Sequence, residues 1–148
     1  MNLIKNVKIR SALNAASSLG ASTGPAIDMS GFEGCLFILH GTSVLEGTTA
    51  NLRTKGAAST TGPWVFYEPQ ASSTKVLTGT FDYRILALDM HKPLKRYIRA
   101  CLTASSSGVP LTGTVTALQY GAQYPESTNL YDSTTVAAIT LAVGATSS

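Results

Sequence analysis

The sequence predicts an all-β fold, an antiparallel β-sandwich or barrel, and two observations lead to this prediction. Apolar or alternating runs of strand length recur about every ten residues, separated by turns rich in Gly, Pro, Ser and Thr. No segment has the 3.6-residue apolar period of an amphipathic helix. Seven to nine short strands of this kind are typical of two packed sheets.

The first quarter of the chain is expected to hold little regular structure. Residues 1–10 alternate and form either an arm or a first strand. Residues 11–24 are small and polar, which predicts a loop with at most a brief helical turn within 11–19. Residues 25–34 then provide a short strand and a turn bounded by glycines.

The core strands follow from continuous or alternating apolar runs. Such runs predict strands at 35–41, 49–56, 95–103 and 113–121. Residues 60–69 lie between Pro63 and Pro69, which limits them to a short or edge strand. Two more strands, in 74–81 and 82–90, are divided near Gly79.

The chain is therefore expected to have three parts. Residues 1–24 form the N-terminal arm or first strand plus a loop, 25–123 the sandwich core, and 124–148 a C-terminal arm. The last part is polar except for an apolar run from Val136 to Val143. That run needs burial, either as a last strand of the sheet or against another subunit.

Composition bounds the class of function. The 148 residues suit one domain with its own core. Only 13% are charged, about half the usual share, which suits a protein packed against others. The net charge of +3 permits an acidic partner without requiring one.

No membrane or export segment is predicted. No apolar run approaches the ~18 residues that cross a bilayer. Residues 1–10 lack the apolar centre of a secretory signal. We expect a protein that is made in the cytoplasm, is not exported by the standard route and does not contact membranes.

The sequence offers no convincing catalytic, cofactor or metal site. Cys35 and Cys101 form no C-x-x-C pair. We interpret them as two buried thiols in a reduced compartment. A disulfide between neighbouring strands is the alternative. Asp89, His91 and Cys101 suggest a nucleophilic set, but a strand-end histidine beside a buried thiol is the simpler interpretation. The eight carboxylates are scattered. We therefore expect no enzyme, no cofactor and no metal.

The segment "DMHKPLKRYIRACLT", residues 89–103, holds four of the eleven basic residues. Strand alternation places Lys95, Tyr97 and Arg99 on one face of it. Interleaved basic and aromatic residues suit a protein contact, a nucleic acid or merely a solvated strand end. The mild net charge disfavours nucleic acid, and Asp82 and Asp89 are candidates to neutralise part of the patch.

Several segments in order resemble a family of small virion proteins of tailed bacteriophages encoded near capsid genes. These are "NVKI", "AIDMSGFEGCLFILHG", "ILALDMHKPLKRYIRACLT" and "GTVTALQYGAQYP", which together span about residues 1–125. The matching positions are Asp28, Gly31, Phe32, Gly34, Asp89, Lys92, Pro93, Lys95, Arg96, Tyr97, Arg99 and 119–121.

The resemblance implies a decoration (cement) protein on the phage head, with a jelly-roll kind of β-sandwich and extended N- and C-terminal arms. The implied partners are the major capsid protein and neighbouring copies, as a homo-oligomer on the virion. The expected contact residues are Lys5, Lys8, Arg10, Lys92, Lys95, Arg96, Tyr97, Arg99, Tyr124 and Tyr131.

Two other functions stay open. One is another virion part, such as a head–tail connector, a tail protein or a fibre-base protein. The other is a carbohydrate-binding β-sandwich module, suggested by the aromatic residues Trp64, Phe66, Tyr67 and Tyr83.

Overall fold

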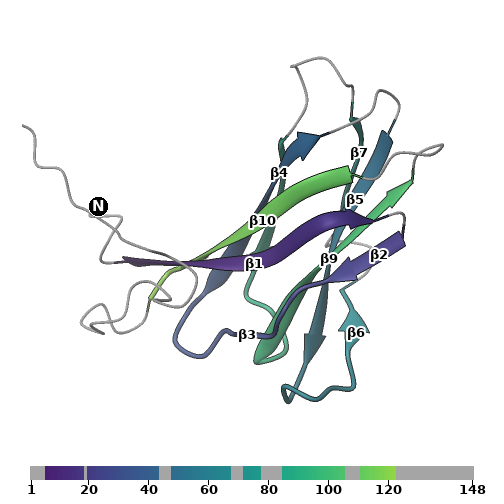
Figure 1. Cartoon of the computed structure of the whole chain (residues 1–148). Coiled ribbons are helices and arrows are strands. Elements are labelled where there is room, and N and C mark those ends of the chain that lie inside the picture. The colour runs from purple at the N-terminus through teal and green to yellow at the C-terminus, as the bar shows by residue number, and fades with distance from the viewer. Residues whose placement is uncertain are drawn as a thin grey trace, which may run out of the picture.

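The chain folds into two antiparallel β-sheets packed face to face (Figure 1). The computed structural model describes residues 6–18, 20–43, 48–67, 72–77, 85–105 and 111–122. Sheet A has the order β1 (Val7–Ser18), β10 (Leu111–Tyr120), β4 (Gly34–Ser43), β8 (Ile85–His91). Sheet B has the order β2 (Gly20–Thr23), β9 (Tyr97–Ser105), β5 (Thr48–Ala57), β6 (Val65–Phe66). In addition, β3 (Ile27–Asp28) pairs with β9, and β7 (Ser72–Leu77) pairs with β5.

The strand order is that of a jelly roll. Because β2 and β3 lie along one edge of β9, and β6 and β7 along one edge of β5, the ten strands of the described ranges occupy eight positions. When these eight positions are numbered in chain order, sheet A has the order 1-8-3-6 and sheet B has the order 2-7-4-5. This two-sheet arrangement of Greek keys confirms the predicted antiparallel sandwich and the jelly-roll topology. The first described strand, β1, therefore lies beside the last described strand, β10 (Figure 1).

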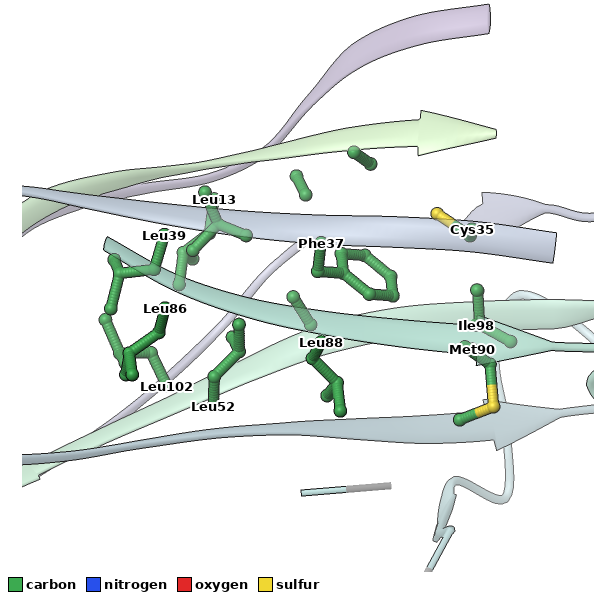
Figure 2. Packing of buried hydrophobic residues seen from close by; sticks show 14 of the residues in the cluster. Leu13, Cys35, Phe37, Leu39, Leu52, Leu86, Leu88, Met90, Ile98 and Leu102 are labelled. Atoms are coloured by element: carbon green, nitrogen blue, oxygen red, sulfur yellow. The ribbon is translucent and has the colours of Figure 1, made fainter. Parts of the chain in front are cut away.

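The core lies between the two sheets (Figure 2). Along β8 every second residue is buried, so that Leu86, Leu88 and Met90 face sheet B. Phe37 on β4 and Leu52 on β5 are fully buried among them. Burial of each such side chain contributes about 1.5–3 kcal/mol, which makes this layer the main source of stability.

Residues 11–18 and 20–23 form strands rather than the expected loop. β1 runs on to Ser18 and β2 covers 20–23. A β-bulge explains the error, because Ser11 is opposite Thr116 while Leu13 is opposite Val115. Ala12 is the extra residue, and both Ala12 and Leu13 are buried, so the period of two is interrupted.

The two cysteines are free and buried, as the simpler prediction had it. Cys35 lies in the core, and burial raises the pKa of its thiol to about 12. Cys101 alternates with core-facing residues of β9 and so lies on the outer side of sheet B. Asp89 and His91 lie on the outer side of sheet A. The nucleophilic set is therefore not assembled.

Within the described ranges, no three His, Cys, Asp or Glu residues are grouped as a metal site would require. Those ranges also contain no helix long and apolar enough to span a membrane.

Several residues for which expectations were stated lie outside the described ranges. These include Lys5, Tyr124 and Tyr131 among the expected contact residues, Asp82 and Tyr83, and the apolar run of the C-terminal part. The division into 1–24, 25–123 and 124–148 stays a prediction.

Candidate protein-binding surface

Three segments that are far apart in the sequence meet at one end of the sandwich. The backbone N–H of Met29 donates to the carbonyl of Arg96 at 2.8 Å, and that of Lys92 donates to Glu33 at 2.7 Å. The N–H of Glu33 donates to the carbonyl of Tyr120 at 3.0 Å. The three groups of residues that carry the phage resemblance, 28–34, 89–99 and 119–121, are thus neighbours in space.

Gln119 connects two of these segments from inside the core. Its side chain is fully buried, and its Nε2 donates to the carbonyl oxygen of Asp28 at 2.7 Å. The same nitrogen lies 3.5 Å from the sulfur of Met29. Because a buried carbonyl without a donor is costly, this amide fixes β3 against β10.

Asp28 anchors residues 92–96, which we call the end loop. Its carboxylate accepts from Arg96 Nε at 3.0 Å and from Arg96 Nη2 at 2.8 Å, a bidentate ion pair. It also accepts from the backbone of Ser30 at 2.9 Å. The hydrogen bond from Arg96 is the largest cause that lowers the pKa of Asp28. Arg96, an expected contact residue, therefore has an internal partner.

Asp89 was a candidate to neutralise the basic segment, but it has another partner. It accepts a 2.8 Å hydrogen bond from the Tyr120 hydroxyl, whose ring stacks on His91 with centroids 6.3 Å apart. Burial, together with this hydrogen bond to Asp89, raises the pKa of Tyr120 to about 12. A Cβ at Gly34 would meet the same ring, which explains why glycine stands there.

The end loop presents an apolar side chain between two cations. Leu94 is 89% exposed, and the neighbouring Lys92 and Lys95 are exposed as well. Neither lysine ammonium has a partner within the described part of the chain. The loop is held from a fourth segment too, because the backbone N–H of Lys95 donates to the Tyr67 hydroxyl at 2.9 Å. It is thus a fixed projection rather than a free turn.

An open pocket of about 520 Å³ lies between the end loop and the 29–33 turn. Its apolar lining comes from Met29, Phe32, Pro93 and Leu94, and its charged lining from Glu33 and the end-loop cations. A hollow of this size accepts one or two side chains of a partner.

The outer surface of sheet B carries a second basic group, which we call the cationic face: Arg53, Lys55, Arg99, Trp64 and Phe66. Arg99 lies 4.1 Å above the Trp64 ring, and Lys55 lies 4.2 Å from the Phe66 centroid. Arg53 lies 3.8 Å from the same Phe66 centroid. These distances are typical of cation–π contacts.

The structure brings together some of the expected contact residues and separates others. Lys92, Lys95, Arg96, Tyr97 and Arg99 form one continuous stretch across the end loop and β9. By contrast, Lys8 and Arg10 lie on β1 in sheet A, opposite Gln119 and Ala117. Arg10 still helps to lower the pKa of Asp28, so its charge acts at the same end of the molecule.

Sequence reasoning missed Leu94, Arg53 and Lys55. The signal for Leu94 was present, since a large apolar residue follows Pro93 within a basic run. The signal for the other two was the alternation of 49–56, which places both on one strand face. Their proximity to Arg99 follows only from the pairing of β5 with β9.

Of the aromatic residues that suggested sugar binding, the three that the structure describes, Trp64, Phe66 and Tyr67, do not form an open platform. Cations lie against the rings of Trp64 and Phe66. Tyr67 is half-buried, packs against the core and binds the end loop through its hydroxyl. The geometry thus favours a charged partner over a stacked sugar ring.

No protein-family model matches the chain, and no curated protein matches its sequence. Among solved structures, the chain is similar to the crystal structure of the SPBc2 prophage-derived protein YomS. The two are 10% identical, with a TM-score of 0.50, over 78% of this chain and 95% of that one. At this identity the likeness shows that the two proteins share a fold.

Proposed function

We propose that this chain is a structural virion protein that binds and stabilises the capsid shell of a tailed bacteriophage. The observation that carries the proposal is Leu94, a large apolar side chain that is 89% exposed on a firmly anchored loop. Together with Phe32 and Pro93 of the adjacent pocket, Leu94 makes an exposed apolar surface with cations at its rim, a combination that occurs at protein-binding sites. Its loop is already ordered, so binding costs little additional entropy.

Two further observations support a phage role. The segments that resemble the phage virion family meet at this end of the molecule, where Asp28, Arg96 and Gln119 support the end loop. The fold is shared with a prophage-derived protein, and jelly rolls are a common architecture of viral capsid domains. We therefore propose the virion as the location and a structural rather than catalytic role.

The proposed partners are the major capsid protein and neighbouring copies of this chain. Leu94 would enter an apolar hollow of the shell while Lys92 and Lys95 meet acidic side chains around it. The pocket beside the loop would receive a partner side chain in return. Many copies on one shell act together, so each contact can be weak and the particle still gain stability.

The test is binding of the purified chain to shells that lack it, followed by electron cryomicroscopy of the decorated particles. We expect hundreds of copies on the outer shell, and Leu94→Asp should weaken cosedimentation at least tenfold. Ile85→Asp is the matched control, because Ile85 is also exposed but begins β8 at the far end from His91. It should bind as the parent does.

Two results would contradict the proposal. One is shell binding that Leu94→Asp leaves unchanged. The other is density in only a few copies at the neck or tail, which would assign the chain to the connector or tail proteins.

A further inference from the structure

Two cations are placed directly opposite each other on the cationic face. Lys55 of β5 pairs in register with Arg99 of β9, and both side chains lie on the outer side of sheet B. Like charges in directly opposed positions destabilise a sheet. The described carboxylates lie elsewhere: Asp28 binds Arg96, Asp89 is on the other sheet with Tyr120, and Glu33 lines the pocket beside the end loop. The repulsion between Lys55 and Arg99 destabilises the fold, and an anionic ligand bound between them would relieve it.

The aromatic rings hold this pair in place. The guanidinium of Arg99 lies on Trp64 and the ammonium of Lys55 on Phe66. A stacked guanidinium keeps its in-plane N–H groups available for an acceptor. The Nε of Arg99 is buried and has no hydrogen-bond partner within the described ranges. Because this Nε is closed off from the surface, a ligand would bind the terminal Nη groups of the fixed guanidinium.

We propose that the cationic face binds a carboxylate-bearing segment of a partner protein, with one carboxylate placed between Lys55 and Arg99. The Cβ atoms of opposed positions in an antiparallel pair are about 5 Å apart, so both long side chains can reach a single carboxylate. This inference deepens the proposed function by naming the chemistry of the shell surface. It rests on that function only for the identity of the partner.

The observations favour a protein over a nucleic acid. Bases bind such surfaces by stacking on exposed rings, whereas cations already lie against Trp64 and Phe66. Nucleic-acid surfaces are also usually far more basic than a chain with a net charge of +3.

The experiment uses Trp64, which is the chain's single tryptophan, as its own reporter. The full chain is titrated with poly-L-glutamate at low salt while tryptophan emission is recorded. We expect a saturable change in emission. Arg99→Gln and Lys55→Glu should each weaken it at least tenfold, whereas His40→Gln, at an exposed position on β4 of sheet A, should leave it unchanged.

The variant Lys55→Glu separates binding from folding. It places opposite charges face to face across β5 and β9, so its thermal midpoint should be no lower than that of the parent. A loss of poly-L-glutamate binding in this well-folded variant would support the proposal. Equal binding by Lys55→Glu and the parent would overturn it.

Two other outcomes would also overturn the inference: no response to saturating poly-L-glutamate, or tighter binding of oligothymidylate, which would indicate a nucleic-acid partner. Neither decides the proposed function, which depends on shell binding and on Leu94. Conversely, a chain that binds poly-L-glutamate but not shells would support the proposed carboxylate site on the cationic face and contradict the proposed shell binding.

Discussion

At the scale of single residues, Asp28 shows how one carboxylate organises a functional loop. Its side chain binds Arg96 and the backbone of Ser30, while its carbonyl receives the buried amide of Gln119. The aspartate of the phage-like "DM" segment thus supports the surface without forming its contact. On the end loop itself, Lys92, Leu94 and Lys95 remain available to a partner.

We expect Asp28→Asn to lower the free energy of unfolding at pH 7 by about 0.5–1 kcal/mol, a small value because the ion pair is partly exposed and screened by solvent. The folded pKa of Asp28 lies below its ordinary 3.8. Its contribution is therefore fully present above that value and is lost as the pH falls through the folded pKa. Urea unfolding of both proteins at pH 7 and about pH 2 checks this. A difference that persists in acid would contradict it.

The cysteines allow a second prediction at this scale. Both thiols are free and buried, and the pKa of Cys35 is raised to about 12. Since the thiolate is the reactive form, dithionitrobenzoate should modify neither cysteine of the folded protein at about pH 8 within minutes. In urea two thiols per chain should react. Fewer than two would indicate a disulfide.

At the scale of elements, the passage from β2 to β3 lies directly against β1. The N–H of Gly24 donates to the carbonyl of Ala100 at 2.9 Å. A Cβ at position 24 would lie 1.8 Å from the backbone oxygen of Ala12, at the bulge. Only glycine allows the two strands this approach.

We expect Gly24→Ala to destabilise the fold by about 1–3 kcal/mol or more, because backbone rather than a flexible side chain must move. Gly31→Ala is a useful comparison, since a Cβ there meets nothing within 4 Å and only the φ of +83° is strained. Its cost should be about 1 kcal/mol and smaller than that of Gly24→Ala. Urea unfolding measures the free energy of unfolding of both variants. Equal losses would show that the backbone of β1 moves aside to accommodate the added Cβ.

The strands of the core were predictable because their apolar runs are flanked by glycine or proline. β4, β5, β9 and β10 lie within a few residues of their expected positions. The strand part of 11–24 was not predictable, because Ala and Ser are weak strand formers and the bulge at Ala12 disrupts the alternation. The alternation of apolar and polar residues indicates which side of a strand is buried, and a bulge interrupts that alternation.

At the scale of the whole molecule, the candidate surface needed the strand order. The basic segment 92–99 was visible as a run, but Lys55 and Phe66 join it only through the pairing of β5 with β9 and β6. The same holds for Asp28 and Gln119, which are 91 residues apart. Local patterns predict strands, whereas the pairing of distant strands depends on how all the faces are buried together.

The collected cations lead to a prediction for the intact molecule. If shell binding uses Lys92, Lys95 and the cationic face, it should weaken as NaCl rises from about 0.1 M to about 1 M. Over that range the Debye length falls from ~10 Å to ~3 Å. Residual binding should depend on Leu94. Cosedimentation at several salt concentrations checks this. Binding that does not change with salt concentration would contradict a role for the cations and indicate a purely apolar contact.

The place of β10 in sheet A also has a consequence for biosynthesis. It lies between β1 and β4, yet it is the last described strand to leave the ribosome. Between Ser43, the end of β4, and Tyr120, the end of β10, there are 77 residues of chain to synthesise. At ~5–20 residues per second this takes roughly 4–15 s. Throughout that interval the nascent chain carries two strands whose shared neighbour does not yet exist, which makes it a substrate for chaperones that hold unpaired strand edges.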